Sequence, residues 1–327
     1  MSATDSTSGH DFANLGPELI CDAMESLGLI PDGRLLALNS FENRVYRVGL
    51  EEAKPVVVKF YRAGRWTDEM IREEHAFSQE LVEADLPVVP PMQINGQSLH
   101  FFRDQRLAVY PLCPGREPDL EDLDNQRWLG RTLARMHQVG RRRSFQHRRT
   151  LEPLGWLNDA RASVLACGQL PDYLLERYQA LIERLGENIS ARFEAICAPR
   201  LRCHGDCHRG NVLWGAQGPH FVDLDDAINA PAVQDLWMLT PASGPAVEQA
   251  LRPVLEGYEQ FQEFDRSELA LVEPLRALRM VRHQAWIAGR WNDPAFPLAF
   301  PGFAQPRHWE EHISDLTEQL QRLETGE

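Results

Sequence analysis

Residues 201–214 read LRCHGDCHRGNVLW, and this stretch decides the fold and chemistry that we expect. It places Asp206 five residues before Asn211 on one tight loop. A second carboxylate, Asp223, follows in HFVDLDDA (220–227), where the apolar Phe-Val pair predicts a short buried strand. Phosphoryl transfer uses such a set, because one carboxylate orients the attacking hydroxyl and accepts its proton while oxygen ligands hold Mg²⁺ against the phosphates.

A lysine earlier in the chain completes this set. Of the 34 basic residues only two are lysines, Lys54 and Lys59. A lysine is a compact point charge and an arginine a planar fork, so a position that keeps lysine is expected to need it. Lys59 ends the strand-like run VVVK, and we assign it as the phosphate-binding cation. Lys54 precedes a proline in a turn. A glutamate on the next helix, Glu74 or Glu73, is expected to pair with Lys59.

The elements around these motifs predict an α+β protein with two lobes and a cleft. The N-terminal lobe, 1–112, is expected to hold a mostly antiparallel five-stranded sheet with helices at 17–28 and 67–84, its strands near 34–38, 43–49, 55–61, 98–103 and 106–111. The polar GLEEAK (49–54) predicts a hairpin turn. The C-terminal lobe, 113–327, follows PLCPG (111–115) and is expected to be mostly helical, with helices at 119–138, 161–197, 246–264, 267–291 and 307–325.

Composition narrows the class of protein. Apolar residues make up 43% of the chain and charged residues 25%, as in ordinary soluble domains. The net charge of −14 argues against a general nucleic-acid binder. No apolar run is long enough to span a membrane, and the polar N-terminus does not resemble a signal peptide. Six scattered cysteines do not form a disulfide framework. We therefore expect a cytoplasmic monomer that uses neither nucleic acid nor membrane as a partner.

The motifs resemble those of a known family. HGDCHRGN followed by VDLDD is similar to the catalytic loop and metal-binding segment of the kinase-like superfamily of aminoglycoside phosphotransferases, choline kinases and homoserine kinases. Within it, eight segments over roughly residues 15–300 resemble the bacterial stress response kinase (SrkA-type) family: SFENRVYRV, VVVKFYRAGRW, EEHAF, HGDCHRGNVLW, FVDLDDAINAPAVQDLWML, FQEFD, EPLRALR and WNDPAFP. The resemblance implies a two-lobed protein-kinase-like fold and a serine/threonine protein kinase that uses ATP and Mg²⁺ on protein substrates.

The resemblance also implies roles for single residues. Asp206 becomes the catalytic proton acceptor, and Asn211 and Asp223 become Mg²⁺ ligands. Asp223 is further implied as a second catalytic residue that accepts phosphate, although its role as a metal ligand is a sufficient explanation.

Nucleotide contacts are implied in the N-terminal lobe as well. The segment LNSFENRVY (38–46) stands where ordinary protein kinases have a glycine-rich loop. The family assigns ATP binding to Ser40, and we expect Asn43 and turn N–H groups to cradle phosphates with it. Tyr110 and Leu112, where the last expected strand leaves the lobe, complete the expected nucleotide site.

Other interpretations of the same residues remain open to different degrees. A zinc knuckle of Cys203, His204, Cys207 and His208 is disfavoured, because structural zinc usually binds two separated pairs of ligands. A Cys–His nucleophile leaves Asn211 unexplained. We expect instead that His204 packs behind the loop and fixes its backbone, and that Cys203 is a core residue.

Three further aspartates and an aromatic group also allow two interpretations. Asp226 is expected to be solvated or capping, and Asp225 stays open as a metal ligand. Asp235 is either a charge at a helix start or a buried anchor that accepts backbone N–H groups from the catalytic loop. For the aromatic group, core packing is favoured over a substrate wall; its members are Trp286, Trp291, Phe296 and Phe300.

Three functions compete. The leading one is a protein serine/threonine kinase, and the second is a small-molecule kinase of the homoserine, choline or aminoglycoside type. The motifs do not separate these two, because only the acceptor site differs. The acidic balance of the chain suits a cationic acceptor in either case. A pseudokinase that only binds partners is third, and the intact Lys59, Asp206, Asn211 and Asp223 argue against it.

Overall fold

The structure, a computed structural model, describes residues 12 and 14–325. The chain divides into two compact units. Unit 1 contains the described residues up to Gln79 together with Val89–Pro114. Unit 2 contains Glu80–Val88 and the described residues from Gly115 onward. Within the described part of the chain, no helix combines the length and hydrophobicity that crossing a lipid bilayer requires.

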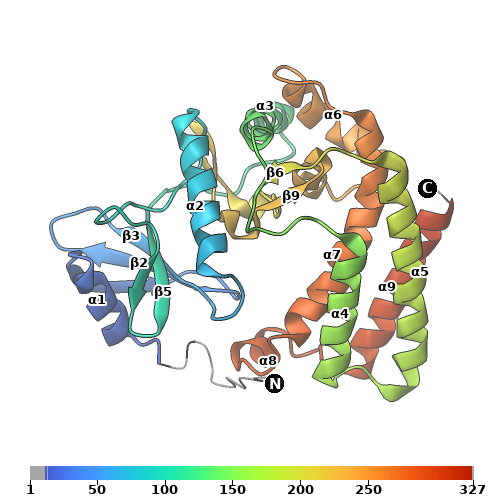
Figure 1. The fold of residues 1–327 in the computed structure, drawn as a ribbon, viewed down its shortest axis with the longest axis horizontal. Coiled ribbons are helices and arrows are strands. Elements are labelled where there is room, and N and C mark those ends of the chain that lie inside the picture. Colours follow the sequence, from blue (N-terminus) through green and yellow to red (C-terminus); the bar gives the residue numbers. More distant parts are fainter. Residues whose placement is uncertain (1–11, 13, 326–327) are drawn as a thin grey trace. The chain divides into compact units, whose positions relative to one another are not determined.

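Unit 1 is built on a five-stranded sheet with strand order β1-β2-β3-β5-β4, in which all neighbours are antiparallel (Figure 1). Its strands are β1 Pro31–Ala37, β2 Arg44–Leu50, β3 Val56–Phe60, β4 His100–Phe102 and β5 Gln105–Pro111. Its helices are α1 Pro17–Ser26 and the first part of α2 Asp68–Glu83. The hairpin predicted over 43–61 is confirmed, with Val45 opposite Lys59 in the β2–β3 register.

The central strand β3 divides its side chains between the two faces of the sheet, as the two-residue period of a strand requires. Val56, Val58 and Phe60 pack against α1 and the neighbouring strands in one buried cluster. A second buried cluster lies between α2 and the sheet, and it contains Ile71 of α2 and Ala108 of β5. Because Ala108 is the β5 partner of Lys59, the single charged residue of β3 lies on the α2 side of the sheet.

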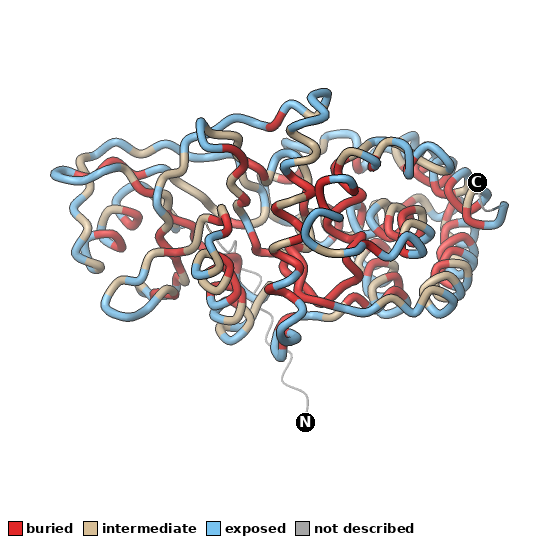
Figure 2. Tube along the Cα trace, turned by 90° about the horizontal axis from the view of Figure 1, so that it is seen from above, coloured by how far each residue is buried: buried red, intermediate tan, exposed pale blue. Residues whose placement is uncertain are grey.

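Unit 2 is mostly helical. Its helices are α3 Leu123–Gly140, α4 Pro153–Cys167, α5 Asp172–Ile196, α6 Ala246–Tyr258, α7 Val272–Ala288, α8 Ala295–Ala299 and α9 Pro306–Thr325. Helix α4 contacts α7, α5 contacts α9, and α7 contacts α9, so these four form one bundle (Figure 1). Helix α3 packs on α6. Figure 2 shows the buried residues along the inner sides of these helices and the exposed ones along their outer turns.

One predicted helix is divided in the structure. The sequence pattern predicts a single helix over 161–197, but α4 already begins at Pro153 and ends at Cys167, and Gly168, which follows it, has a φ of 69°. Helix α5 starts after Pro171. Glycine adopts the left-handed conformation without steric cost, and proline has no N–H with which to continue a preceding helix, so the CGQLP stretch breaks the helix.

Short strands and turns lie between α5 and α6. The strands β6 Leu201–Cys203 and β9 Ile228–Ala230 pair with each other, and β7 Val212–Gly215 pairs with β8 Gly218–Phe221. The 3₁₀ turns η1 Arg209–Asn211, η2 Leu224–Asp226, η3 Ala232–Asp235 and η4 Trp237–Leu239 connect or follow them, and η5 Arg266–Leu271 precedes α7. These two small ribbons hold the loop that carries the predicted catalytic residues.

Candidate active site

The loop between β6 and β7 is anchored from below by a buried carboxylate. Asp235 has an exposed fraction of 0%. Its Oδ2 accepts the backbone N–H of His204 at 2.7 Å, and its Oδ1 accepts that of Gly205 at 2.8 Å. His137 of α3 donates from Nε2 to the same carboxylate at 3.1 Å. The interpretation of Asp235 as a buried anchor of the catalytic loop is therefore confirmed.

The negative charge of the Asp235 carboxylate is stabilised by the groups around it. Burial by itself raises the pKa of Asp235, but the hydrogen bond and charge of His137 and the backbone N–H of Gly205 outweigh it and lower the pKa. A carboxylate that accepts several N–H bonds keeps its negative charge even in a buried place. His137 is itself fixed, because its Nδ1 lies 2.8 Å from the hydroxyl of Tyr258. Sequence reasoning missed His137, which lies far from the motif in the chain.

His204 connects the loop to the segment that carries Asp223. Its ring is buried, and Nε2 donates to the carbonyl of Val222 at 2.9 Å. Gly205 is close to the same segment: its φ is +87°, and a Cβ there would lie 2.0 Å from the carbonyl oxygen of Asp226. The expectation that His204 fixes the loop from behind is confirmed, and Gly205 explains why the motif needs a glycine.

Asp206 stands at the tip of this anchored loop. Its Oδ1 lies 2.6 Å from Nη1 of Arg279 on α7, and its Oδ2 lies 3.4 Å from Nε2 of His208. Burial acts to raise the pKa of Asp206, but the hydrogen bond from His208 and the charge of Arg279 are stronger, and the pKa is well below its usual range. Asp206 is therefore ionised at neutral pH, as a proton acceptor must be. Arg279 was not among the residues that the motif predicted.

Asn211 and Asp223 offer oxygen atoms near the same loop. The amide nitrogen of Asn211 donates to the carbonyl of Asp206 at 2.9 Å, so the orientation of the amide is set and its oxygen is turned away from that bond. The carbonyl of Asn211 accepts the N–H of Val222, which directly precedes Asp223. Asp223 is exposed and adopts a left-handed conformation with a φ of 60°. A carboxylate and an amide oxygen are hard ligands that fit Mg²⁺.

The residues next to Asp223 are held by an arginine. Arg148 is buried and donates from Nε to the carbonyl of Ala227 at 2.9 Å and from Nη2 to the carbonyl of Asp225. Asp225 is itself buried, whereas Asp226 is half-buried. The segment after Asp223 is thus fixed through its backbone, and the possible metal role of Asp225 stays open.

The cysteines of the motif are core residues. Cys203 and Cys207 are both buried, and burial raises the pKa of each thiol well above its usual value. The thiol of Cys203 lies 3.5 Å from the carbonyl oxygen of Ala230. A thiol binds zinc only after losing its proton, so these surroundings favour the core interpretation over a zinc knuckle. His208, one of the two histidines of the supposed zinc knuckle, accepts the backbone N–H of Gly210 at Nδ1.

The predicted nucleotide residues of unit 1 lie on β3, α2 and β5. Lys59 is 7% exposed, and its Nζ lies 5.6 Å from the ring centre of Tyr110 and 5.9 Å from that of Tyr61. The hydroxyls of Tyr61 and Tyr110 are 3.1 Å apart. Glu74 is buried and Glu73 half-buried. This difference favours Glu74 as the partner of Lys59, and the pairing stays a prediction.

The loop before β2 is organised by its own hydrogen bonds. Ser40 donates from Oγ to the carbonyl of Asn43 at 3.2 Å. The side-chain oxygen of Asn43 accepts the backbone N–H of Arg62 at 3.2 Å, and Asn43 is buried. Asn43 thus ties the loop to the chain just after β3, a structural contact that the sequence analysis did not foresee. Leu112 lies half-buried just after β5.

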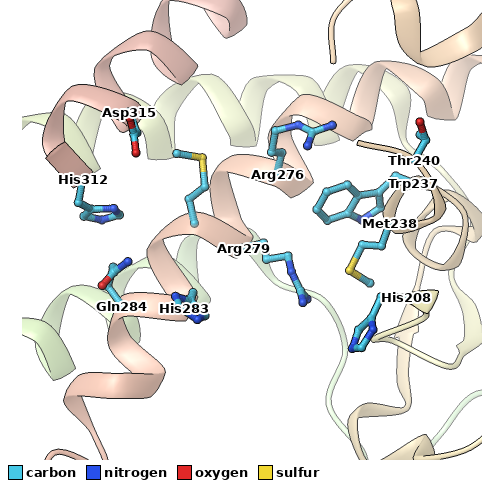
Figure 3. A pocket seen from close by; sticks show the side chains of 11 residues that line it. His208, Trp237, Met238, Thr240, Arg276, Arg279, His283, Gln284, His312 and Asp315 are labelled. Atoms are coloured by element: carbon cyan, nitrogen blue, oxygen red, sulfur yellow. The ribbon is translucent and has the colours of Figure 1, made fainter. Parts of the chain in front are cut away.

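A pocket of about 500 Å³ opens in unit 2 beside Asp206 (Figure 3). Both side chains that contact the Asp206 carboxylate, His208 and Arg279, line it. The other lining residues come from η4 and the chain after it, from α7 and from α9: Trp237, Met238, Thr240, Arg276, Met280, His283, Gln284, His312 and Asp315. A pocket of this size beside an ionised carboxylate is suited to hold the molecule on which that carboxylate acts.

The aromatic group near α8 packs on itself. Trp286 lies 4.9 Å from Phe296 and 5.7 Å from Phe300 between ring centres, in edge-on arrangements. Trp291 packs on Phe303 at 4.9 Å. Phe296 is buried, whereas Trp286, Trp291 and Phe300 are half-buried, so core packing is confirmed for Phe296 and stays a prediction for the other three.

Comparison with known proteins agrees with this geometry. The model of the phosphotransferase enzyme family matches residues 34–272. The stress response kinase A of Escherichia coli (strain K12) is 41% identical over 317 residues, with 97% of this chain and 96% of the relative covered. A relative in Salmonella typhimurium, described as serine/threonine protein kinase RdoA, is 40% identical over 317 residues, with 95% and 94% covered.

Solved structures show the same fold. An amicoumacin kinase, hAmiN, in complex with AMP-PNP, Ca²⁺ and Ami superposes with a TM-score of 0.69 at 19% identity, covering 92% of this chain and 91% of that one. The predicted α+β kinase-like fold and the predicted family are thereby confirmed. The chain is an ATP-dependent phosphotransferase that belongs to the phosphotransferase enzyme family and, within it, to the stress response kinases.

Proposed function

We propose that this chain transfers the γ-phosphate of ATP to serine or threonine hydroxyls of protein substrates, with Mg²⁺ as the metal. The observation that carries the proposal is the ionised Asp206 on a loop whose backbone is bonded to the buried Asp235. The relative described as a serine/threonine protein kinase, 40% identical over 95% of this chain, supports the protein acceptor.

In this mechanism Asp206 orients the acceptor hydroxyl and takes its proton while the oxygen attacks the γ-phosphorus. The bond between the γ-phosphorus and the bridging oxygen breaks, and ADP leaves. Asn211 and Asp223 would hold Mg²⁺, which neutralises phosphate charge when it is bound. Lys59 contributes a further positive charge for the phosphates, and Glu74 keeps it in place. Ser40, Tyr110 and Leu112 are proposed to contact the nucleotide.

A small-molecule acceptor is the second candidate. The pocket beside Asp206 has a volume of about 500 Å³, within the range of ordinary small-ligand sites. This observation fits an amino alcohol, a sugar or an antibiotic as well as a peptide side chain and its neighbours.

Label transfer from γ-labelled ATP in a cell extract separates the two candidates. The full chain is added to a desalted protein fraction and, separately, to the small-molecule fraction of the same extract. The chain with Asp206→Asn serves as the matched control. We expect Asp206-dependent label on proteins. Label that appears only among small molecules would refute the protein acceptor and leave the phosphotransferase assignment intact.

A further inference from the structure

The feature that carries a further inference is the ion pair between Arg279 and Asp206. A hydroxyl that gives its proton to Asp206 has to approach one of the two carboxylate oxygens. Oδ1 is held by Nη1 of Arg279 at 2.6 Å, and Oδ2 faces Nε2 of His208 at 3.4 Å. In this arrangement the Arg279 guanidinium competes with an incoming hydroxyl for the carboxylate oxygen that it contacts.

Arg279 is placed so that it could change partners. Its side chain is 50% exposed, compared with 26% for Asp206, and it extends from α7 into the pocket towards His208 (Figure 3). Arginine has a long flexible stem and a planar fork that binds carboxylates in a bidentate manner. A second carboxylate in the pocket could therefore take the guanidinium with little rearrangement of α7.

Arg276, one turn earlier on α7, shows the contrast. Its Nε lies 3.3 Å from a carboxylate oxygen of Glu273, its Nη2 donates to the carbonyl of Ala242, and its guanidinium lies 5.3 Å from the ring centre of Trp237. Arg276 is thus fixed by neighbours of its own. Among the residues that the structure describes, the acidic contact of Arg279 is Asp206.

A second observation marks the pocket as a place for a ligand. His312 is 5% exposed and lines the pocket, and within the described chain its Nε2 has no hydrogen-bond partner. Burial lowers the pKa of His312 to about 3, so the ring is neutral. A buried polar atom without a partner is costly and calls for one from a bound molecule. Met238 and Met280 add flexible apolar walls that adapt to different shapes.

We propose that Arg279 selects the acceptor: the preferred hydroxyl belongs to a serine or threonine beside a carboxylate, which binds the Arg279 guanidinium and frees Oδ1 of Asp206. The hydroxyl then gives its proton to Asp206 and its oxygen bonds to the γ-phosphorus as ADP leaves. The inference rests on the proposed role of Asp206. It also departs from the expectation of a cationic acceptor, because the pocket charge nearest the reacting carboxylate is positive although the whole chain carries −14.

The test measures kcat/KM for serine peptides that differ in one residue, Glu, Gln or Lys, beside the serine. The variants are Arg279→Gln and Arg279→Glu. The control is Arg322→Gln on α9, which removes a half-buried arginine paired with Glu318 at 2.8 Å. We expect the natural chain to prefer the Glu peptide over the Gln peptide by about 10- to 100-fold, as for one charge-assisted hydrogen bond. Arg279→Gln should abolish the preference, and Arg279→Glu should shift it to the Lys peptide.

Rescue by a conservative variant separates this role from a merely structural one. Arg279→Lys keeps the positive charge, so it should keep the preference for the Glu peptide that Arg279→Gln loses. Equal use of all three peptides by the natural chain, or an equal loss of all three in Arg279→Gln, would overturn the inference.

Free serine and serinamide, which differ in one carboxylate, form a second arm of the same experiment. If no peptide is labelled but serine is preferred over serinamide in an Arg279-dependent manner, the protein acceptor is refuted and the role of Arg279 is supported. If both arms are labelled without any dependence on a carboxylate, Asp206 keeps its proposed role and the inference about Arg279 is refuted.

Discussion

Replacing Asp235 tests how the catalytic loop is held. Each carboxylate oxygen of Asp235 accepts a different backbone N–H, that of His204 on Oδ2 and that of Gly205 on Oδ1. An asparagine has only one oxygen, so Asp235→Asn must leave one of the two N–H groups unpaired in either orientation. Asp235→Ala leaves both unpaired, together with Nε2 of His137, which donates to the same carboxylate. An unpaired buried N–H costs about 1–3 kcal/mol, so we expect losses of about 1–3 kcal/mol for Asn and about 3–9 kcal/mol for Ala.

Urea unfolding followed by tryptophan fluorescence measures these losses. Trp66 is the single tryptophan of unit 1, and the other seven of the eight lie in unit 2, where the substitutions act. Asp159→Asn, which changes an exposed carboxylate on α4, is the control and should stay within about 0.5 kcal/mol of the natural chain. The loss should be graded, with Ala greater than Asn.

Two results would refute this reasoning. One is a loss below about 0.5 kcal/mol for Asp235→Ala, which would mean that the two N–H groups find other partners at no cost. The other is equal loss in Asn and Ala, which would mean that the charge of Asp235 matters and the two separate hydrogen bonds do not. Turnover should fall in both variants, because the anchored backbone positions Asp206.

Four further predictions concern the reaction and its pH dependence. Asp206→Asn should lower kcat by about 10²–10⁴-fold with little change in nucleotide affinity, measured by nucleotide titration; loss of binding would make Asp206 an anchor and not a base. Lys59→Arg should lose most activity in a folded chain, since the guanidinium is wider than the ammonium; near-normal turnover would contradict this. Asp223→Ala should raise the Mg²⁺ concentration needed for half-maximal rate, and Asn211→Ala should do so less; unchanged Mg²⁺ dependence would exclude both as ligands. Burial raises the pKa of Glu268 to about 7, so the protonated carboxyl stabilises the fold at low pH and this contribution is lost as pH rises through about 7. The unfolding free energy should therefore fall between about pH 5 and about pH 8, and Glu268→Gln should flatten that fall. An unchanged pH dependence in Glu268→Gln would mean that the carboxyl titrates normally.

The sequence predicted the parts of the fold that have local signals. Alternating apolar residues and a polar turn predict the β2–β3 hairpin, and the structure has it. The single helix predicted over 161–197 is wrong, although the sequence has a local signal for its division, Gly168 followed by Pro171. The prediction gave more weight to the helical periodicity on either side of these residues.

The candidate site was predictable where one short stretch carries it. Asp206 and Asn211 share a loop, and their hydrogen bond follows from that spacing. Arg279 lies 73 residues from Asp206 in the chain and meets it only because the fold of unit 2 brings its side chain to the loop. His137 lies 98 residues from Asp235. No periodicity or spacing in a single sequence specifies such pairs, because tertiary packing creates them.

The close approach at Gly205 means that the parts of the site are already positioned before nucleotide binds. The loop with Asp206 and the segment with Asp223 touch at backbone distance, so neither can shift without the other. Their spacing is then set when unit 2 folds, before any nucleotide arrives, and binding energy need not be spent on assembling them. Such preorganised amides should open to solvent only with unit 2 as a whole. The His204 and Gly205 amides are thus expected among the slowest-exchanging in hydrogen–deuterium exchange, with or without ATP.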